Sequence, residues 1–93
     1  MSTEDLTTQI ARAASERQTF VPLDCGDSTT LPGSVGDLQA ARHMLITGKN
    51  LRQLPPEIGR LSNLETLRFE YTRLSSLPPE IGELENLRVL GLD

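Results

Sequence analysis

The sequence predicts an α/β fold built from one repeated unit that contains a strand, a turn and a short helix. The first observation is an internal repeat, since residues 51–64 read LRQLPPEIGRLSNL and residues 74–87 read LSSLPPEIGELENL. These segments share ten of fourteen residues at an offset of 23. The second observation is that six apolar columns keep this offset through three repeats. Their first members are Leu31, Val35, Leu38, Ala41, Met44 and Ile46.

The apolar spacing changes within each unit, and the change indicates where strand and helix lie. Leu67 and Phe69 alternate with polar residues, which is the two-residue period of a short strand. The proline pair at 55–56 lies where a helix would begin, because the missing proline N–H costs no hydrogen bond there. The apolar residues after each proline pair are spaced by three, which suits a 3-10 or α turn. They are Ile58, Leu61 and Leu64, and then Ile81, Leu84 and Leu87.

This arrangement resembles the leucine-rich repeat, whose pattern is LxxLxLxx(N/C)xL. The pattern is matched by Leu64, Leu67, Phe69, Thr72 and Leu74, and the segment LPPEIGELENL follows. Over residues 21–93 the chain is most similar to the intracellular repeats of Ras-suppressor-like proteins, bacterial Roco-type GTPases and some bacterial effectors. The resemblance implies an α/β leucine-rich-repeat solenoid, with short parallel strands on a concave side and helical turns on the convex side. We expect strands near residues 20–24, 43–47, 66–70 and 89–92.

One position departs from the family pattern. The asparagine that usually satisfies backbone groups between neighbouring coils is replaced by Gly26, Lys49 and Thr72. The Thr72 hydroxyl can still donate and accept, whereas Lys49 offers only donors and is expected to point outward. An orphaned buried backbone group costs roughly 1–3 kcal/mol. We therefore expect looser contacts between coils than in a consensus array.

Residues 1–19 are predicted to form an N-terminal capping helix. Residues 20–93 are predicted to form about three 23-residue repeats plus the strand of the next repeat. Within residues 2–18, acidic residues come first, and Arg12 and Arg17 lie toward the end, as the helix dipole favours. The apolar face consists of Leu6, Ile10, Ala13 and Ala14. The alternative is a helix that binds a partner or a membrane surface, which small alanines and mixed charge disfavour.

The two ends of the predicted stack differ. Pro22 lies inside the first strand and suits an edge position, because proline cannot donate to a neighbouring strand. At the other end the sequence stops inside a strand, which leaves apolar side chains facing solvent beside an unpaired edge. These are Leu84, Leu87, Leu90 and Leu92. We expect the N-terminal part of a longer protein, with weak self-association through this end. The alternative is a natural miniature that covers this end by self-association or with a partner.

Composition excludes several classes of protein. The chain has 93 residues, one cysteine, one histidine and a formal charge of −4. It cannot form an internal disulfide or a Cys/His zinc site. The acidic balance gives no electrostatic footprint for nucleic acid or for an anionic membrane. Neither a secretory signal nor a membrane span is recognisable, so we expect a soluble, cytoplasmic chain without metal or cofactor.

Two sets of side chains were weighed as catalytic groups. Cys25 and His43 could lie one coil apart, but the repeat register sets Cys25 beside Gly48 and His43 beside Phe20. We interpret them as a small turn residue and a surface histidine.

The second set consists of carboxylates. Asp24, Glu70 and Asp93 occupy one column, with Thr47 between the first two. Two strand spacings place Asp24 and Glu70 about 10 Å apart, with no cleft to raise either pKa. The segment GDSTTLPGSVG lacks the GK[ST] end of a phosphate-binding loop. We therefore expect surface carboxylates and no enzyme activity.

Side chains that point away from the core are expected to line the concave face and the turn that follows the third strand. The candidate binding residues are Phe20, Asp24, His43, Leu45, Thr47, Thr66, Arg68, Glu70, Tyr71 and Arg73. Exposed aromatic and arginine side chains are typical of protein interfaces. The resemblance implies a non-catalytic protein–protein interaction module in intracellular signalling of bacterial type. The alternative is a regulatory or substrate-docking N-terminal part of a larger enzyme, whose GTPase, kinase, TIR-type or ubiquitin-ligase domain lies beyond Asp93.

Overall fold

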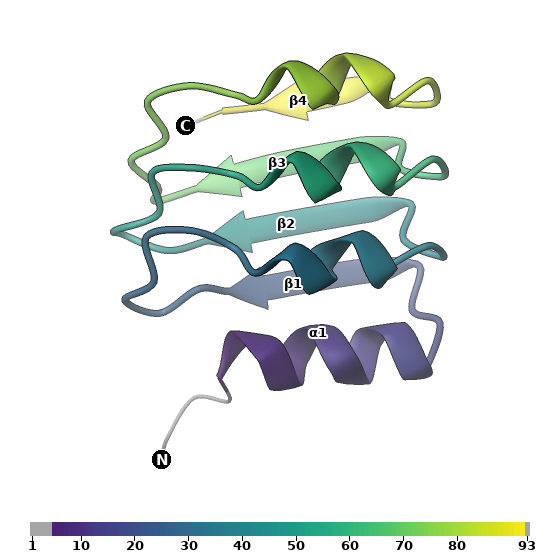
Figure 1. Ribbon diagram of the computed structural model, residues 1–93, viewed down its shortest axis with the longest axis horizontal. Coiled ribbons are helices and arrows are strands. Elements are labelled where there is room, and N and C mark those ends of the chain that lie inside the picture. Colours follow the sequence, from purple (N-terminus) through teal and green to yellow (C-terminus); the bar gives the residue numbers. More distant parts are fainter. Residues whose placement is uncertain (1–4, 93) are drawn as a thin grey trace.

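The structure is a computed structural model that describes residues 5–92. Expectations that concern residues 1–4 and Asp93 lie outside the described residues. The elements in chain order are α1 (Leu6–Ser15), β1 (Phe20–Asp24), η1 (Gly33–Asp37), β2 (His43–Thr47), η2 (Pro56–Arg60), β3 (Thr66–Glu70), η3 (Pro79–Glu83) and β4 (Val89–Gly91), where η denotes a 3-10 helix. Figure 1 shows these elements as a stack of coils that rises from α1.

The four strands form one parallel sheet in the order β1-β2-β3-β4. Phe20 pairs with His43, His43 with Thr66, and Thr66 with Val89, so each strand is offset from its neighbour by one sequence repeat. The predicted parallel pairing and register are confirmed. The last strand ends at Gly91, one residue earlier than predicted.

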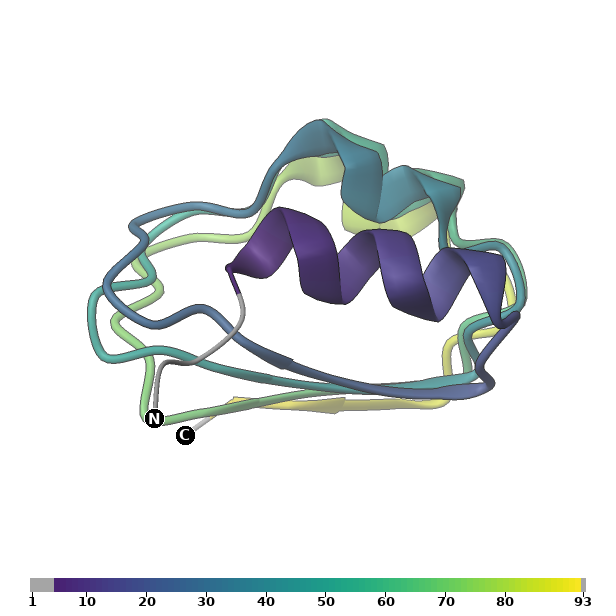
Figure 2. The ribbon, with the colours of Figure 1, turned by 90° about the horizontal axis from the view of Figure 1, so that it is seen from below.

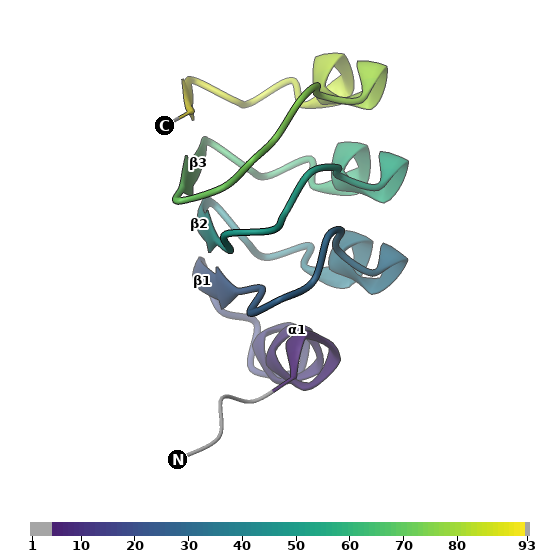
Figure 3. The same ribbon diagram turned by 90° about the vertical axis from the view of Figure 1, so that its left-hand side faces the viewer.

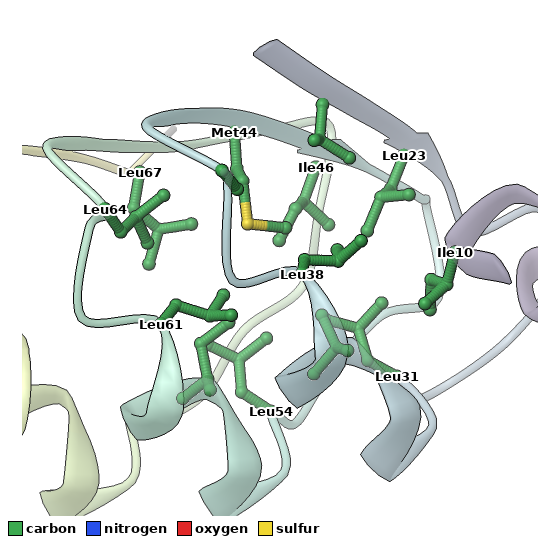
Figure 4. Packing of buried hydrophobic residues seen from close by; sticks show 14 of the residues in the cluster. Ile10, Leu23, Leu31, Leu38, Met44, Ile46, Leu54, Leu61, Leu64 and Leu67 are labelled. Carbon is green, nitrogen blue, oxygen red and sulfur yellow. The ribbon is translucent and has the colours of Figure 1, made fainter. Parts of the chain in front are cut away.

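The core fills the space between the sheet and the layer of helical turns, which Figure 3 shows on opposite sides of the stack. Leu23, Ile46 and Phe69 occupy one inward column and are almost completely buried. The close-up in Figure 4 shows that Leu61 and Leu64 point into the same space from the second helical turn and the segment after it. A fully buried leucine contributes about 1.5–3 kcal/mol. The inward columns therefore supply most of the driving force for stacking.

The helical turns are shorter and tighter than α-helices. Pro55 holds an extended backbone before η2, and the Ile58 N–H then donates to the Pro55 carbonyl at 3.1 Å. The next bond runs from the Leu61 N–H to the Ile58 carbonyl at 3.3 Å. Both bonds span three residues, so the three-residue spacing read from the sequence corresponds to 3-10 geometry.

Helix α1 begins at Leu6 because Asp5 caps it. The Asp5 carboxylate accepts a hydrogen bond from the Thr8 N–H at 2.8 Å, which lowers the pKa of Asp5 below its ordinary value. The helix ends at Ser15, earlier than the predicted residue 18, and Arg17 then adopts a left-handed backbone with φ 52°.

The side chain of Gln9 closes the edge of the sheet at α1. Its amide nitrogen donates to the Asp24 carbonyl at 2.9 Å, and its amide oxygen accepts from the Asp24 N–H at 3.0 Å. This paired contact replaces the bonds that another strand would make. Pro22 suits this edge strand because it has no N–H that would need a hydrogen-bond partner. Figure 2 shows α1 lying across the gap between sheet and helical turns.

Neighbouring coils are joined at a second asparagine position, whereas the looser contacts expected from the missing consensus asparagine stay a prediction. Asn63 donates its side-chain amide to the Gln39 carbonyl at 2.8 Å, and Asn86 donates to the Ser62 carbonyl at 2.6 Å. Both bonds link one coil to the preceding coil, at the turn between the helical turn and the next strand. Lys49 is exposed as predicted, and its ammonium lies 3.8 Å from the Asp27 carboxylate.

The predicted exposure of the C-terminal leucines is correct only in part. Leu84 is 5% exposed, because η3 stacks on η2 and turns this side chain into the shared core. Leu87 is partly buried. Leu90 and Leu92 remain exposed at 40% and 56%. The apolar surface at this end therefore lies on the last strand rather than on the whole coil.

Candidate functional site

The candidate site lies on the sheet surface that faces away from the helical turns, which we call the outer face. The parallel register arranges its side chains in three rows across the strands. The described members are Phe20, His43, Thr66 and Val89 in the first row, Pro22, Leu45, Arg68 and Gly91 in the second, and Asp24, Thr47 and Glu70 in the third. The structure thus brings together the predicted strand residues, as the 23-residue offset requires.

Exposure varies across the outer face. Phe20 is 56% exposed, and His43 and Arg68 are also exposed. Leu45, which we predicted to be exposed, is half-buried. The reason is its central strand, because Pro22 and Arg68 flank it on both sides. Leu45 therefore lies lower on the outer face than the exposed Pro22 and Arg68 on either side.

Tyr71 is the most exposed of the large apolar side chains described, at 76%. Simple alternation along β3 would point it inward, because Phe69 points inward. Its backbone instead has φ 59°, in the left-handed region that bulky residues rarely adopt. The ring is thereby turned out at the end of the outer face.

The equivalent residues in the earlier repeats are small. They are Cys25 and Gly48, and both are buried. A Cβ atom on Gly48 would lie 2.7 Å from the Cys25 Cβ, so these two coils leave room for only one side chain at this position. Tyr71 differs from both, because its large side chain is exposed.

Cys25 begins the turn after β1, as predicted, because its carbonyl accepts from the Ser28 N–H at 3.0 Å, and it is also a core residue. It is 3% exposed, and its N–H donates to the Thr47 carbonyl at 2.8 Å. Burial, with a smaller effect of the Asp24 charge, raises the pKa of the Cys25 thiol to about 11. The thiol therefore stays protonated at neutral pH and is a poor nucleophile.

The other weighed groups remain apart. His43 pairs in register with Phe20, as expected. Asp24 and Glu70 are separated by Thr47 on β2. The Asp24 carboxylate accepts a hydrogen bond from the Gly26 N–H at 2.9 Å, which stabilises the turn after β1. These contacts are structural.

Two open depressions of the described chain lie at the helical turns and at the turns before the strands. One open depression of about 350 Å³ separates α1 from η1, where Ala13, Gln18 and Leu38 contribute to its lining. Another, of about 410 Å³, lies at the turns before the strands, next to Arg42 and Arg88. Residues 5–92 include no group of three or more His, Cys, Asp or Glu side chains placed to hold a metal ion. In the same part of the chain, no helix is long and apolar enough to cross a membrane.

Comparison with solved structures defines the class of protein. The leucine-rich repeat domain of the type III effector XopL superimposes with a TM-score of 0.74 and 27% identity over 92% of this chain. A leucine-rich repeat protein of Leptospira interrogans matches with a TM-score of 0.47 and 30% identity over 89% of this chain. No family profile and no curated protein matches the sequence.

The coil of strand and 3-10 turn, repeated in register, is that of a leucine-rich repeat solenoid, and the chain is a leucine-rich repeat protein. This confirms the fold that the LPPEIG segments implied. The chain spans 29% of the length of the XopL domain chain and 28% of the Leptospira chain.

Proposed function

We propose that this chain is a non-catalytic protein–protein interaction module that binds through its outer face. The observation that carries the proposal is the display of Phe20 and Arg68 on the parallel sheet and of Tyr71 on the turn after β3. Aromatic and arginine side chains dominate binding energy at protein interfaces, since an aromatic ring covers a large area with few rotatable bonds and a guanidinium group makes several hydrogen bonds at once. The remaining predicted residues, Asp24, His43, Leu45, Thr47, Thr66, Glu70 and Arg73, surround these anchors.

We also propose where the chain acts and what its two parts do. The XopL domain belongs to a type III effector, and we propose that this chain also acts in signalling inside a cell, in the cytoplasm and in a bacterial context. Residues 1–19 serve as a cap, and residues 20–93 serve as the recognition array. The partner is a protein rather than a nucleic acid or a membrane, because the formal charge is −4.

A second candidate function is a docking part of a larger enzyme. The observation that favours it is the XopL likeness, since that domain is part of an effector and this chain spans 29% of it. The same outer face would then hold a substrate protein or regulate a catalytic domain beyond residue 93.

The test is a selection of binders from an unbiased random-peptide library against the full chain, followed by mapping on amide chemical shifts. We expect selected binders to shift residues of β1–β3. Phe20→Ala and Arg68→Ala should each weaken them about tenfold. Arg60→Ala removes an exposed arginine from η2 and serves as the matched control. Binders that survive both outer-face changes but are lost with Arg60→Ala would contradict the proposal.

We also propose weak self-association at β4 with a second copy of the chain. Val89, Leu90 and Leu92 are 49%, 40% and 56% exposed beside the strand edge. So small a patch supports weak dimers at high concentration rather than an obligate dimer. A dilution series should move the amide signals of residues 89–92 and leave those of α1 unchanged. Signals that are independent of concentration up to the solubility limit would contradict it.

A further inference from the structure

Four exposed residues lie on β3 and on the turns after β2 and β3, and we call them the Tyr71 corner: Arg52, Arg68, Tyr71 and Arg73. Arg68 lies on β3, and Tyr71 and Arg73 lie on the turn that follows. The Arg73 N–H donates to the Leu51 carbonyl at 2.8 Å, which holds this turn against the residue that precedes Arg52. In Figure 3 the segment leaving β3 climbs diagonally to the next helical turn, so the corner borders an irregular connection.

The arginines of the corner are available for a partner. All three are exposed. Among the described residues, the ion pairs of the repeats join Arg42 to Glu65 and Lys49 to Asp27, each at 3.8 Å. Arg52, Arg68 and Arg73 make no ion pair within residues 5–92. Their guanidinium groups can therefore engage carboxylates without breaking an ion pair within the described residues.

Charge differs between the helical turns and the region of β2 and β3, whereas β1 and its turn carry Asp24 and Asp27 and no cation. The helical turns carry four carboxylates and one guanidinium, which are Asp37, Glu57, Glu80, Glu83 and Arg60. The strands β2 and β3 with the turns after them, residues 43–53 and 66–73, carry four cations and one carboxylate. These are Lys49, Arg52, Arg68, Arg73 and Glu70. The corner is thus a local positive region on a negative molecule, which favours a negatively charged partner.

The backbone conformation of Tyr71 also supports a binding role for the corner. A left-handed conformation is disfavoured for an aromatic residue, and such strain persists at sites where it positions a side chain for function. Here it presents a 76% exposed ring between Arg68 and Arg73 in the sequence. An apolar anchor flanked by cations fits an apolar residue flanked by carboxylates.

We propose that the Tyr71 corner binds an acidic segment of a partner protein, with an apolar residue packed on the Tyr71 ring and carboxylates on the flanking arginines. This inference rests on the proposed function and names the chemistry of the partner. A protein segment fits better than a nucleic acid or a membrane because the corner is small. It also contains an aromatic ring, which is typical of protein interfaces, and Glu70 borders it.

The test uses the full, isotope-labelled chain and two synthetic peptides of equal length. The acidic probe is Glu-Glu-Phe-Glu-Glu repeated twice, and the control peptide carries Lys in place of every Glu. The acidic probe should shift the amide signals of residues 66–73, more weakly as salt rises. The lysine peptide should leave these signals unchanged. Shifts of equal size with both peptides would contradict the charge argument.

A matched pair of double variants tests whether the acidic probe binds at the Tyr71 corner. Arg68→Ala with Arg73→Ala should weaken the acidic probe about tenfold or more. Arg42→Ala with Arg60→Ala removes the same charge elsewhere and should change the affinity less than about twofold. Equal losses in both pairs would mean attraction by overall charge and would overturn the inference. Tighter binding of a single-stranded oligonucleotide, or of vesicles containing phosphatidylserine, at the same salt would overturn the partner class.

The outcomes separate this inference from the proposed function. If the acidic probe leaves residues 66–73 unshifted while library-selected binders still map to the outer face, the acidic partner is wrong and the interaction module stands. If no selected binder maps to the outer face, both proposals fail.

Discussion

The turns after β2 and β3 occupy equivalent positions in the repeat but have different structures. In the first turn, Gly48 is buried beside Cys25, and Leu51 is completely buried. In the second turn, the residue equivalent to Gly48 is Tyr71, which is turned out by its left-handed backbone. The residue equivalent to Leu51 is Leu74, which is only partly buried. A repeated sequence therefore gives a repeated structure only where each side chain fits the space that its neighbours leave.

The comparison also shows how a stack of coils acquires a distinct surface. The turn after β2 contributes to the core, whereas the turn after β3 displays an aromatic ring. The lower burial of Leu74 is shared by Leu77, Ile81 and Leu87, which belong to the last coil of the described residues. The flanking Arg68 and Arg73 make that display useful for binding. Predictions that contrast equivalent residues in the two turns test this division directly.

The largest expected difference is between the two leucines. Leu51→Ala should lower the free energy of unfolding by about 2–5 kcal/mol, because it leaves a cavity at a completely buried position. Leu74→Ala should lower it by about 1 kcal/mol, since Leu74 is only partly buried. Urea denaturation of both variants checks the contrast. Equal losses would mean that the second turn is packed as tightly as the first.

The next largest effect is expected at Gly48. Gly48→Ala should destabilise the fold by about 1–3 kcal/mol, because the new Cβ would lie 2.7 Å from the Cys25 Cβ. Gly82→Ala is the matched control, since a Cβ there has nothing within 4 Å. Thermal melts should show a large fall for the first change and little or none for the second. A Gly48→Ala variant as stable as the control would show that the corner can relax.

A smaller effect is expected from the buried thiol. The pKa of Cys25 is raised from 9.0 to about 11 in the folded chain, so the folded state holds this proton more tightly than the unfolded state does. The resulting stability should be present below pH 9 and lost as pH rises through about 11. Cys25→Ser removes the titrating thiol and is the control. Stability profiles that match above pH 9, apart from a constant offset, would contradict the raised pKa.

Most of the fold was predictable because the apolar columns are strict. Residues such as Ile46 and Phe69 must face the core in every coil, so a 23-residue offset determines both strand position and register. The 3-10 turns follow from the proline pairs and the three-residue spacing. Boundaries were less predictable. α1 ends at Ser15 because Arg17 adopts a left-handed backbone, which composition does not reveal.

The contacts that were missed depend on three-dimensional geometry. Asn63 and Asn86 are identical at the repeat offset, and this was a usable signal, but the offset alone does not say which backbone carbonyl each amide meets. The pairing of Gln9 with Asp24 joins residues from different elements and has no sequence pattern. Tyr71 replaces the small Gly48 at the repeat offset, which the sequence shows. The outward direction of its ring could be known only from the backbone dihedral angle.

The most direct test of the account is the paired measurement of stability and binding for Tyr71→Gly. Glycine adopts the left-handed backbone without strain, so the melting temperature should rise by about 4 °C. Loss of the ring should weaken the acidic probe about tenfold. Tyr71→Ala keeps the strained backbone position and should lose the binding without the gain in stability. A Tyr71→Gly variant that melts lower than the parent chain, or that binds the probe equally well, would contradict the claim that this turn gives up stability to display a binding residue.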